Sequence, residues 1–416
     1  MYSDMRSITV LFKDFLLRVL PIYQKILVYR LKHKKRVTVV FFAMSRAMWR
    51  YQNLYELMSR NSRFNVWVVI LPCTTYSAKQ QNDDEIQLME FFESKGVRYL
   101  LGKDGGDLMD LRRTLNPDIL FYPQPYNGYY PKSLSYNAFY DKLLCYVPYA
   151  FWTSTDGWSY NQPLHKVAWK LFYSTQFHRE EAKRYAFRKD KNVEIVGYPN
   201  ADDFLFREHI NVWKKQNDNK IRRRLIWAPH FTINKGGPLY QSNFLWMAEI
   251  MKKVACHYMD ELQIAFKPHP RLFSELCNHK DWGISRTQQY YDFWQSMPNT
   301  QYENGDFVDL FMTSDAMIHD SSSFCVEYLY SGNPVLYIAL DYERQYEEKN
   351  TLGRLALSNH YIGRNESDIW DFIKDKVINK NDPQKAAREV FISKYLMPPN
   401  DSTVSQNIID IILDEL

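Results

Sequence analysis

Glycine is scarce in this chain, at 14 of 416 residues, and the glycine-rich phosphate-binding motifs are missing. Without a Gly-x-Gly-x-x-Gly or a Walker loop, the sequence lacks the signatures of dinucleotide and P-loop ATP binding. It also lacks the His-Glu-x-x-His spacing of zinc hydrolases and the Gly-x-Ser-x-Gly elbow of serine hydrolases. We therefore expect neither a catalytic metal nor a bound cofactor.

Cysteine is rare too, with five scattered residues and no Cys-x-x-Cys pair. This usage is typical of a reducing compartment and disfavours a structural zinc site. No run of about 18 apolar residues occurs, so we expect no membrane-spanning helix. The N-terminal apolar region is broken by Lys13, Asp14 and Arg18, which disfavours a cleavable signal peptide.

Basic charge is concentrated at the N-terminus. Residues 1–36 hold nine of the 53 basic and two of the 48 acidic residues, which leaves 44 and 46 in the rest. The near-neutral remainder disfavours nucleic-acid binding across a broad face. Residues 8–36 predict a basic amphipathic helix that lies on an anionic membrane surface. The alternative is a helix packed on the body of the protein. Its apolar side comprises Phe12, Leu16, Val19, Leu20, Tyr23, Leu27 and Leu31.

From residue 36 onward, β-branched and aromatic runs alternate with helical patterns in two series. Buried strands that alternate with helices predict parallel sheets covered on both faces. We expect an α/β fold of two doubly wound, Rossmann-like domains facing a central cleft, where ligands meet the carboxyl ends of strands. The expected divisions are an N-terminal segment (1–35), a first domain (36–212), a linker (213–224), a second domain (225–396) and a C-terminal helix (397–416).

The strongest chemical signal is a polar turn between a predicted strand and a predicted helix. It reads His319-Asp320-Ser321-Ser322-Ser323, and the helix opens at the serines. Helix N-termini present unpaired N–H groups and a positive dipole end, which suits phosphate. Because Asp and Ser are also preferred N-cap residues, capping alone is the alternative interpretation.

Three other segments accompany this turn. In Phe266–Arg271, two prolines fix the backbone around His269, and Lys267 and Arg271 place a cation on either side. Such a set can stabilise negative phosphate oxygens. His230 follows the first strand of the second series. The segment Cys145–Asp156 combines aromatic residues with a carboxylate, for binding an acceptor or for aromatic packing.

In order and spacing, these segments resemble the CDP-glycerol glycerophosphotransferase family of teichoic-acid and capsule synthesis. The resemblance covers about residues 190–345 and rests on four stretches: Val196–Asp202 with its Gly-x-Pro-x-x-Asp pattern, Ala228-Pro229-His230, Lys267-Pro268-His269-Pro270, and Asp320-Ser321-Ser322-Ser323 through Glu327-Tyr328. It implies a GT-B fold, a CDP-activated polyol donor, a polymer or lipid-linked acceptor, and peripheral attachment to the cytoplasmic face of the cell membrane.

The same resemblance implies roles for single residues. Lys267 and His269 would contact the donor diphosphate, and Ser322 and Ser323 would bind it at the helix start. We expect Glu327 to orient the cytidine ribose. Arg271, Asp320 and Ser321 complete the expected donor-binding set.

The chain departs from the family in the first domain. The family carries Trp-His-Gly-x-Pro-Leu-Lys, whose histidine is the proposed general base, whereas residues 158–165 keep the Pro-Leu pair without the His-Gly. The base is therefore open between Asp156, His165 and His230, with His269 as a further catalytic candidate. A histidine with a pKa near 6.5 suits the role best.

Three functions are consistent with these residues. The first is transfer of a polyol phosphate, most simply glycerol phosphate, to an acceptor hydroxyl with release of CMP. The second keeps the fold but uses a nucleotide sugar in surface polysaccharide or lipopolysaccharide assembly. The third is a non-catalytic GT-B partner protein, which the missing His-Gly favours.

Overall fold

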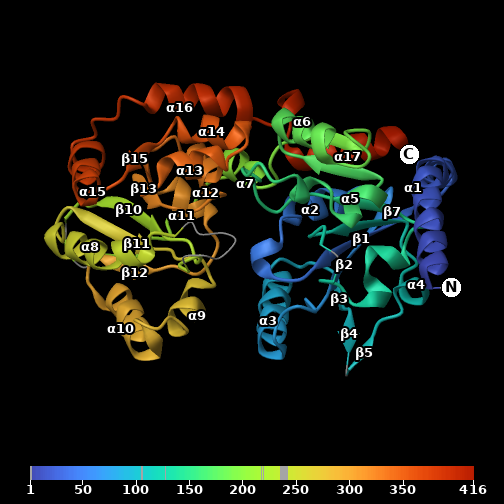
Figure 1. Ribbon diagram of the computed structural model, residues 1–416, viewed down its shortest axis with the longest axis horizontal. Helices are drawn as coiled ribbons and strands as arrows, with labels where there is room; N and C mark the ends of the chain where they lie inside the picture. The colour runs from blue at the N-terminus through green and yellow to red at the C-terminus, as the bar shows by residue number, and fades with distance from the viewer. Residues whose placement is uncertain (1, 105, 127, 217, 219, 235–241) are drawn as a thin grey trace. The chain divides into compact units, whose positions relative to one another are not determined.

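The computed structural model describes residues 2–104, 106–126, 128–216, 218, 220–234 and 242–416. It consists of two compact units, each built on one parallel sheet (Figure 1). Unit 1 comprises Met1–Ala150, Asp156–Asp202 and Pro398–Leu416. Unit 2 comprises Phe151–Thr155 and Asp203–Met397. The two-domain α/β architecture is of the GT-B type.

The sheet of unit 1 has the strand order β3-β2-β1-β6-β7-β8-β9, with every neighbouring pair parallel. Its central strands consist of buried residues throughout, as expected for a sheet covered on both faces. The strands are β1 (Val37–Ala43), β2 (Phe64–Ile70), β3 (Tyr99–Leu101), β6 (Ile119–Tyr122), β7 (Leu143–Tyr146), β8 (Lys170–Tyr173) and β9 (Val193–Ile195). A separate hairpin joins β4 (Lys103–Asp104) to β5 (Asp107–Leu108). The helices are α1 (Tyr2–Lys32), α2 (Gln52–Arg60), α3 (Ala78–Ser94), α4 (Leu111–Thr114), α5 (Pro163–Val167), α6 (Gln176–Tyr185) and α17 (Val404–Glu415).

The sheet of unit 2 has the order β12-β11-β10-β13-β14-β15 and is also parallel. An aromatic core lies against it, where the Trp227 ring stacks on Phe266 and Phe244 at centroid distances of 4.9 and 5.7 Å. The strands are β10 (Arg223–Ala228), β11 (Leu262–Phe266), β12 (Thr300–Tyr302), β13 (Ala316–His319), β14 (Val335–Ile338) and β15 (Tyr361–Gly363). The helices are α8 (Phe244–His257), α9 (Leu272–Cys277), α10 (Gly283–Ser296), α11 (Val308–Met312), α12 (Phe324–Glu327), α13 (Tyr342–Glu347), α14 (Thr351–Leu357), α15 (Glu366–Asp371) and α16 (Lys385–Phe391). Helix α7 (Ala201–Phe206) spans the boundary between the two units.

Two edge strands were not predicted from the sequence. β12 and β15 are three residues long, too short to show a periodic pattern. Each extends the sheet by pairing with a longer neighbour, β11 and β14 respectively. The hairpin strands β4 and β5 were not predicted either, and the other strands lie within two residues of buried runs in the sequence.

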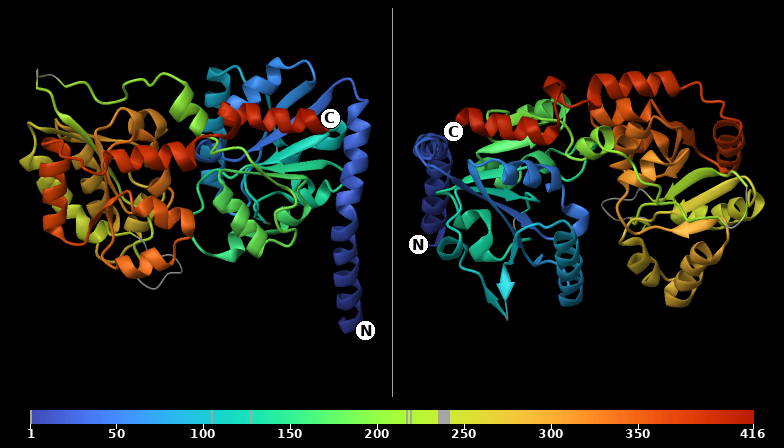
Figure 2. Two further views of the ribbon diagram at one scale, coloured as in Figure 1. Left: turned by 90° about the horizontal axis from the view of Figure 1, so that it is seen from above. Right: turned by 180° about the vertical axis from the view of Figure 1, so that it is seen from behind.

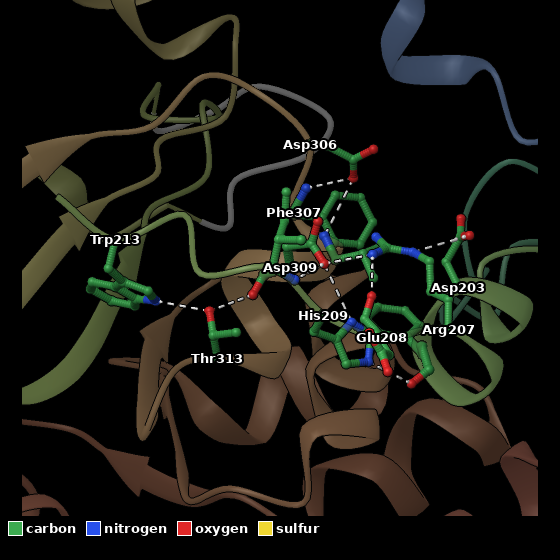
Figure 3. Close-up of polar contacts among 12 residues, drawn as sticks. Asp203, Arg207, Glu208, His209, Trp213, Asp306, Phe307, Asp309 and Thr313 are labelled. Carbon is green, nitrogen blue, oxygen red and sulfur yellow. Dashed lines mark hydrogen bonds and ion pairs between the residues drawn. The ribbon is translucent and has the colours of Figure 1, made fainter. Parts of the chain in front are cut away.

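The boundary between the units differs from the expected linker at 213–224. Residues 203–213 belong to unit 2, where Asp309 and Thr313 accept several of their hydrogen bonds (Figure 3). The Arg207 guanidinium donates to Asp309 Oδ1 at 2.7 Å, and the indole N–H of Trp213 donates to Thr313 Oγ1 at 3.1 Å. The ring of Phe204 stacks on Tyr330 at 4.8 Å. The expected linker is itself bonded to unit 2: the Lys214 N–H donates to Gln301 Oε1 at 2.7 Å, and the Arg222 Nε–H donates to Met259 O at 2.7 Å.

The C-terminal segment contains a helix, α17, and belongs to unit 1. The carboxylate of Asp202 accepts the backbone N–H groups of Val404 and Ser405 at 2.6 and 3.0 Å. These bonds satisfy unpaired N–H groups at the start of α17. Helix α17 packs against α2 in unit 1. No pattern in the sequence predicts this contact between residues 202 and 404, which are far apart in the chain, so only the folded structure shows it.

Helix α1 is continuous from Tyr2 to Lys32, and its first part extends away from the rest of unit 1 in the left view of Figure 2. Gln24, Val28 and Leu31 are buried against unit 1. On its outer side the helix carries a stripe of exposed apolar residues at helical spacing: Val19, Ile22, Ile26 and Tyr29. Of the apolar face predicted above, Val19 lies in this outer stripe, whereas Leu31 packs against the rest of unit 1 and Leu20, Tyr23 and Leu27 are half-buried. No helix in the described part of the chain has the length and hydropathy needed to cross a membrane.

Candidate active site at the carboxyl ends of three strands

The three polar segments of the second series follow three adjacent strands of unit 2. β11, β10 and β13 are neighbours in the sheet and run in the same direction. Their carboxyl ends therefore release Lys267–Arg271, Pro229–His230 and Asp320–Ser323 at the same sheet edge. The backbone N–H of His269 donates to Pro229 O at 3.0 Å, which joins the first two loops directly.

Asp320 holds this edge together. Its carboxylate is buried and accepts the backbone N–H of His230 at 2.6 Å and that of Asn243 at 2.5 Å. A side-chain hydrogen bond from Ser242 adds to these. Burial raises the pKa of Asp320 to about 7. Because all its bonds go to protein groups, Asp320 positions the loops of the site and does not itself face a ligand.

His230 and His269 lie together, with ring centroids 5.1 Å apart. The Nδ1 atom of His269 accepts the Arg271 backbone N–H at 3.1 Å, and Nδ1 of His230 contacts the Thr232 hydroxyl at 2.9 Å. The Thr232 N–H also points to His230 Nδ1, at 3.4 Å. These contacts place the proton of each neutral ring on Nε2. Each imidazole can thus donate one N–H bond from the sheet edge.

Both imidazoles are neutral near pH 7. Burial, together with the Lys349 and Arg271 cations, lowers the pKa of His230 to about 4. Burial also lowers the pKa of His269 to about 3. A group with so low a pKa is a weak proton acceptor at pH 7, whereas its N–H remains a good donor to phosphate oxygen. The geometry therefore favours anion binding by these two residues over proton abstraction.

The Ser323 side chain does not cap the helix that follows the serine turn. Ser323 occupies the N-cap position of α12 with helical backbone angles and makes no side-chain capping bond. Helix α12 is four residues long and continues as a 3-10 turn (Tyr328–Ser331), so it has only a small dipole. Ser322 and Ser323 are half-buried at the strand end. Capping therefore does not account for Ser323, and the position of both serines suits donation to a ligand.

The remaining members of the expected donor set differ in placement. The ammonium of Lys267 donates to Gly305 O at 2.8 Å. Arg271 is exposed, with its guanidinium 4.2 Å above the Phe231 ring and bonded to Glu275. Ser321 and Glu327 are buried, Glu327 at the end of α12. The roles expected for these residues remain predictions.

Asp156 and His165 belong to unit 1. Asp156 is exposed and accepts the Ser159 backbone N–H at 2.8 Å. His165 is buried between Tyr146 and Tyr173, and its Nδ1 accepts the Gln162 N–H. Burial lowers the pKa of His165 to about 3. An imidazole closed off from solvent and this weakly basic is a poor candidate for a general base.

One cation at this edge, Lys349, was not predicted from the sequence. It is buried, and its Nζ lies 2.7 Å from Ser322 Oγ. In the sequence it follows Glu347 and Glu348, a run typical of a solvated surface. No pattern in the chain distinguishes it from an exposed lysine.

Behind the serine turn lie three buried side chains with metal-ligating atoms, His319, Cys325 and His360, all within 4.8 Å of one another. The Nδ1 of His319 accepts the Ser321 N–H at 3.2 Å, so its Nε2 carries the proton. The Nδ1 of His360 donates to Ala356 O at 2.8 Å, so its Nε2 is unprotonated. A metal ion would need the lone pair that protonation removes from His319. The arrangement thus fits two neutral imidazoles better than a resident metal.

The sequence profile of the family described as CDP-glycerol:poly(glycerophosphate) glycerophosphotransferase matches residues 153–414. This chain belongs to that glycerophosphotransferase family. The match covers all of the strands and loops that form the candidate site in unit 2. It also begins at Thr153, in the short segment that joins unit 2 ahead of its main part.

The individual relatives have low sequence identity to this chain. The chain is 25% identical over 200 residues to a teichoic acid poly(glycerol phosphate) polymerase of Bacillus spizizenii, and the match spans 46% of each protein. It thus covers about half the length of that relative. The fold is similar to a variant of the wall teichoic acid polymerase TagF, at 13% identity and a TM-score of 0.54 over 100% of this chain and 98% of that chain. It is also similar to the UDP-GlcNAc 2-epimerase of Neisseria meningitidis, at 12% identity and a TM-score of 0.57 over 91% and 100%.

Proposed function

We propose that this protein transfers glycerol phosphate from CDP-glycerol to a hydroxyl of a growing surface polymer of the teichoic-acid or capsule type. The observation that carries the proposal is the meeting of three loops at one sheet edge in unit 2. They supply two neutral imidazoles, His230 and His269, and the serine turn 321–323. These are phosphate-binding groups in a member of the glycerophosphotransferase family.

In this reaction the acceptor oxygen attacks the phosphorus that bears glycerol, and the bond from that phosphorus to CMP breaks. The acceptor proton passes to a base, and negative charge grows on the departing CMP. Electrostatic stabilisation of such charge is the main contribution a protein makes to phosphoryl transfer. The Nε2–H groups of His230 and His269 and the hydroxyls of Ser322 and Ser323 are suited to donate to these oxygens.

The reaction needs a base that takes the acceptor proton. His230 and His269 have low pKa values, and His165 is enclosed by aromatic rings. Of the four candidates named from the sequence, Asp156 alone is an exposed carboxylate, in the unit that we expect to bind the acceptor. We therefore favour Asp156 among these four.

We further propose that α1 holds the protein on the anionic cytoplasmic surface of the cell membrane. The support is its exposed apolar stripe, Val19, Ile22, Ile26 and Tyr29, flanked by Arg18 and Lys25. A groove of about 780 Å³ beside the helix is lined by seven basic side chains and one acidic one, Arg18, Lys25, Lys32, Lys170, Arg188, Lys189, Lys191 and Glu415. Apolar insertion combined with several cations is the usual basis of interfacial binding.

Sedimentation with vesicles tests this attachment. Ile26 and Ile86 are both 45% exposed isoleucines on helices of unit 1, but only Ile26 belongs to the stripe. Ile26→Glu should abolish most co-sedimentation with phosphatidylglycerol vesicles, and Ile86→Glu should leave it unchanged. Equal loss in both variants would contradict the proposed role of α1.

The activity is tested by product analysis with purified protein, CDP-glycerol and a lipid-linked glycerol phosphate primer. We expect release of CMP and lengthening of the primer. UDP-N-acetylglucosamine is supplied in parallel, because the fold is shared with an enzyme named for UDP-GlcNAc. Release of UDP in place of CMP would replace the proposal with a nucleotide-sugar transferase. Failure to bind or turn over either donor would favour a non-catalytic partner.

A further inference from the structure

Lys349 is a buried cation without a carboxylate partner in the described part of the chain. The residue is 3% exposed, and its Nζ contacts Ser322 Oγ at 2.7 Å. The neighbouring Glu348 does not neutralise it, since the Glu348 carboxylate pairs with Arg344 at 2.8 Å. Lysine is almost never fully buried unless it is paired. The position therefore requires an explanation.

The backbone around Lys349 is fixed on both sides by the segment Phe151–Thr155. Lys349 forms a β-bridge with Ser154, Thr155 N–H donates to Glu348 O at 3.0 Å, and Asn350 N–H donates to Thr153 O at 2.7 Å. The Thr153 hydroxyl in turn reaches Ser322 O at 3.4 Å. One strand-like segment thus contacts both the lysine and the serine turn, and it fixes the backbone from which the lysine side chain extends.

The titratable groups that interact electrostatically with Lys349 are His230, His319, Cys325 and Glu348. Burial lowers the pKa of both imidazoles and raises that of the Cys325 thiol to about 12, so these three are uncharged near pH 7. Burial also lowers the pKa of Lys349 itself. The site thus has a cation, neutral donors and no bound counter-charge, an arrangement completed by an anion.

We propose that Lys349 and Ser322 form an anion subsite that receives the diphosphate of the nucleotide-linked donor. The inference rests on the proposed function for its donor, but the subsite requires only a diphosphate. The ammonium acts as a point charge, and the serine hydroxyl and the nearby Nε2–H of His230 supply hydrogen bonds. Lys349 is then a substrate-binding residue that the chain holds in place before the donor arrives.

The subsite predicts opposite effects of one substitution on stability and on binding. A lysine whose folded pKa lies below its unfolded pKa disfavours folding at pH values below the folded pKa. Lys349→Met keeps the aliphatic stem and removes the charge, so the ligand-free variant should be at least as thermostable as wild type at pH 7. The same variant should bind CDP at least tenfold more weakly, because the anion loses its cation.

Calorimetric titration with CDP, UDP and cytidine tests the subsite in the full-length protein. We compare wild type, Lys349→Met, Lys349→Arg and, as a matched control, Lys385→Met on the exposed surface of α16. Lys349→Met should lose the affinity difference between CDP and cytidine, and Lys385→Met should keep it. Because burial lowers the pKa of Lys349, wild-type affinity for CDP should fall as the pH is raised and Lys349 deprotonates, and Lys349→Arg should show a smaller fall.

The outcomes separate the subsite from the proposed function. If wild type prefers UDP over CDP and Lys349→Met loses UDP, the subsite stands and the CDP-glycerol proposal fails. If Lys349→Met binds CDP within twofold of wild type, the subsite is wrong while the proposed function stands. A ligand-free Lys349→Met that unfolds well below wild type would assign the lysine a structural role and overturn the inference.

Discussion

The carboxylate of Asp320 accepts the backbone N–H of His230 at 2.6 Å, across 90 residues of chain. This bond ties the end of β13 to the loop after β10. A second carboxylate, Asp315, makes the corresponding bond at the opposite ends of the same two strands, where it accepts the Arg224 N–H at 2.8 Å. The two aspartates therefore do the same structural work, one at the proposed site and one away from it.

Asp320→Asn should destabilise the protein by about 2–4 kcal/mol, because an amide NH₂ then faces a buried backbone N–H and leaves it unsatisfied. It should also weaken CDP binding, since His230 is no longer positioned. Asp315→Asn is the matched control, with a loss of stability but normal CDP affinity. Urea unfolding and CDP titration measure both effects. Equal CDP affinity in the two variants would show that the Asp320 bond does not shape the site.

Ser323→Ala should leave the free energy of unfolding unchanged, because this hydroxyl makes no capping bond. CDP affinity or turnover should fall at least about tenfold if the hydroxyl donates to phosphate. Thr403→Ala provides the contrast, since Thr403 does cap α17 by accepting the Gln406 N–H. That variant should lose about 1 kcal/mol of stability with normal turnover. A comparable loss of stability in Ser323→Ala would restore the capping interpretation.

His269 is expected to act through its Nε2–H. His269→Gln can place an amide N–H near that position, whereas His269→Asn places its amide near Nδ1 and leaves Nε2 empty. Turnover should therefore fall at least about tenfold in the Asn variant and less in the Gln variant. His257→Asn, on the exposed end of α8, serves as the control. Identical losses in the Gln and Asn variants would argue against donation from Nε2.

Gly197 stands at a positive φ of 101°, and a Cβ there would lie 2.8 Å from Val404 Cγ2. Gly197→Ala should thus destabilise unit 1 by about 1–3 kcal/mol or more. Gly96 also has a positive φ, of 63°, but a methyl group added there would have no atom of the described residues within 4 Å. The difference in melting temperature between Gly197→Ala and Gly96→Ala reports this crowding, by Val404 of α17 and by Pro398, together with the larger backbone strain at a φ of 101°. The absence of any difference would mean that α17 does not pack there.

The stability of the protein should fall as the pH drops from about 6.5 toward 4. Five histidines have a pKa lowered by burial, so the unfolded chain takes up protons below pH 6.5 that the folded chain refuses. They are His165, His230, His269, His319 and His360. Asp320 opposes them, because its raised pKa lets the folded state bind a proton below about pH 7. Asp320→Asn should therefore show a steeper loss of melting temperature between pH 7.5 and 5 than wild type. A wild-type melting temperature that is equal at both pH values would contradict this balance.

The amino-acid sequence by itself determined the parallel α/β class, most of the strands and the three loop segments of the site. Those features are local: buried runs such as Val37–Ala43 and Ala316–His319 are continuous in the chain, and prolines beside His269 restrict the backbone directly. Only the tertiary structure decided which loops meet, because strand order brings β11, β10 and β13 together out of sequence. The tertiary structure also placed α17 in unit 1, where the Asp202 carboxylate accepts the backbone N–H at its first residue, and it buried Lys349 beside Ser322. Burial depends on packing between segments far apart in the chain. Because of this packing, Lys349, which stands in a charged run of the sequence, is a buried cation that we propose binds an anion.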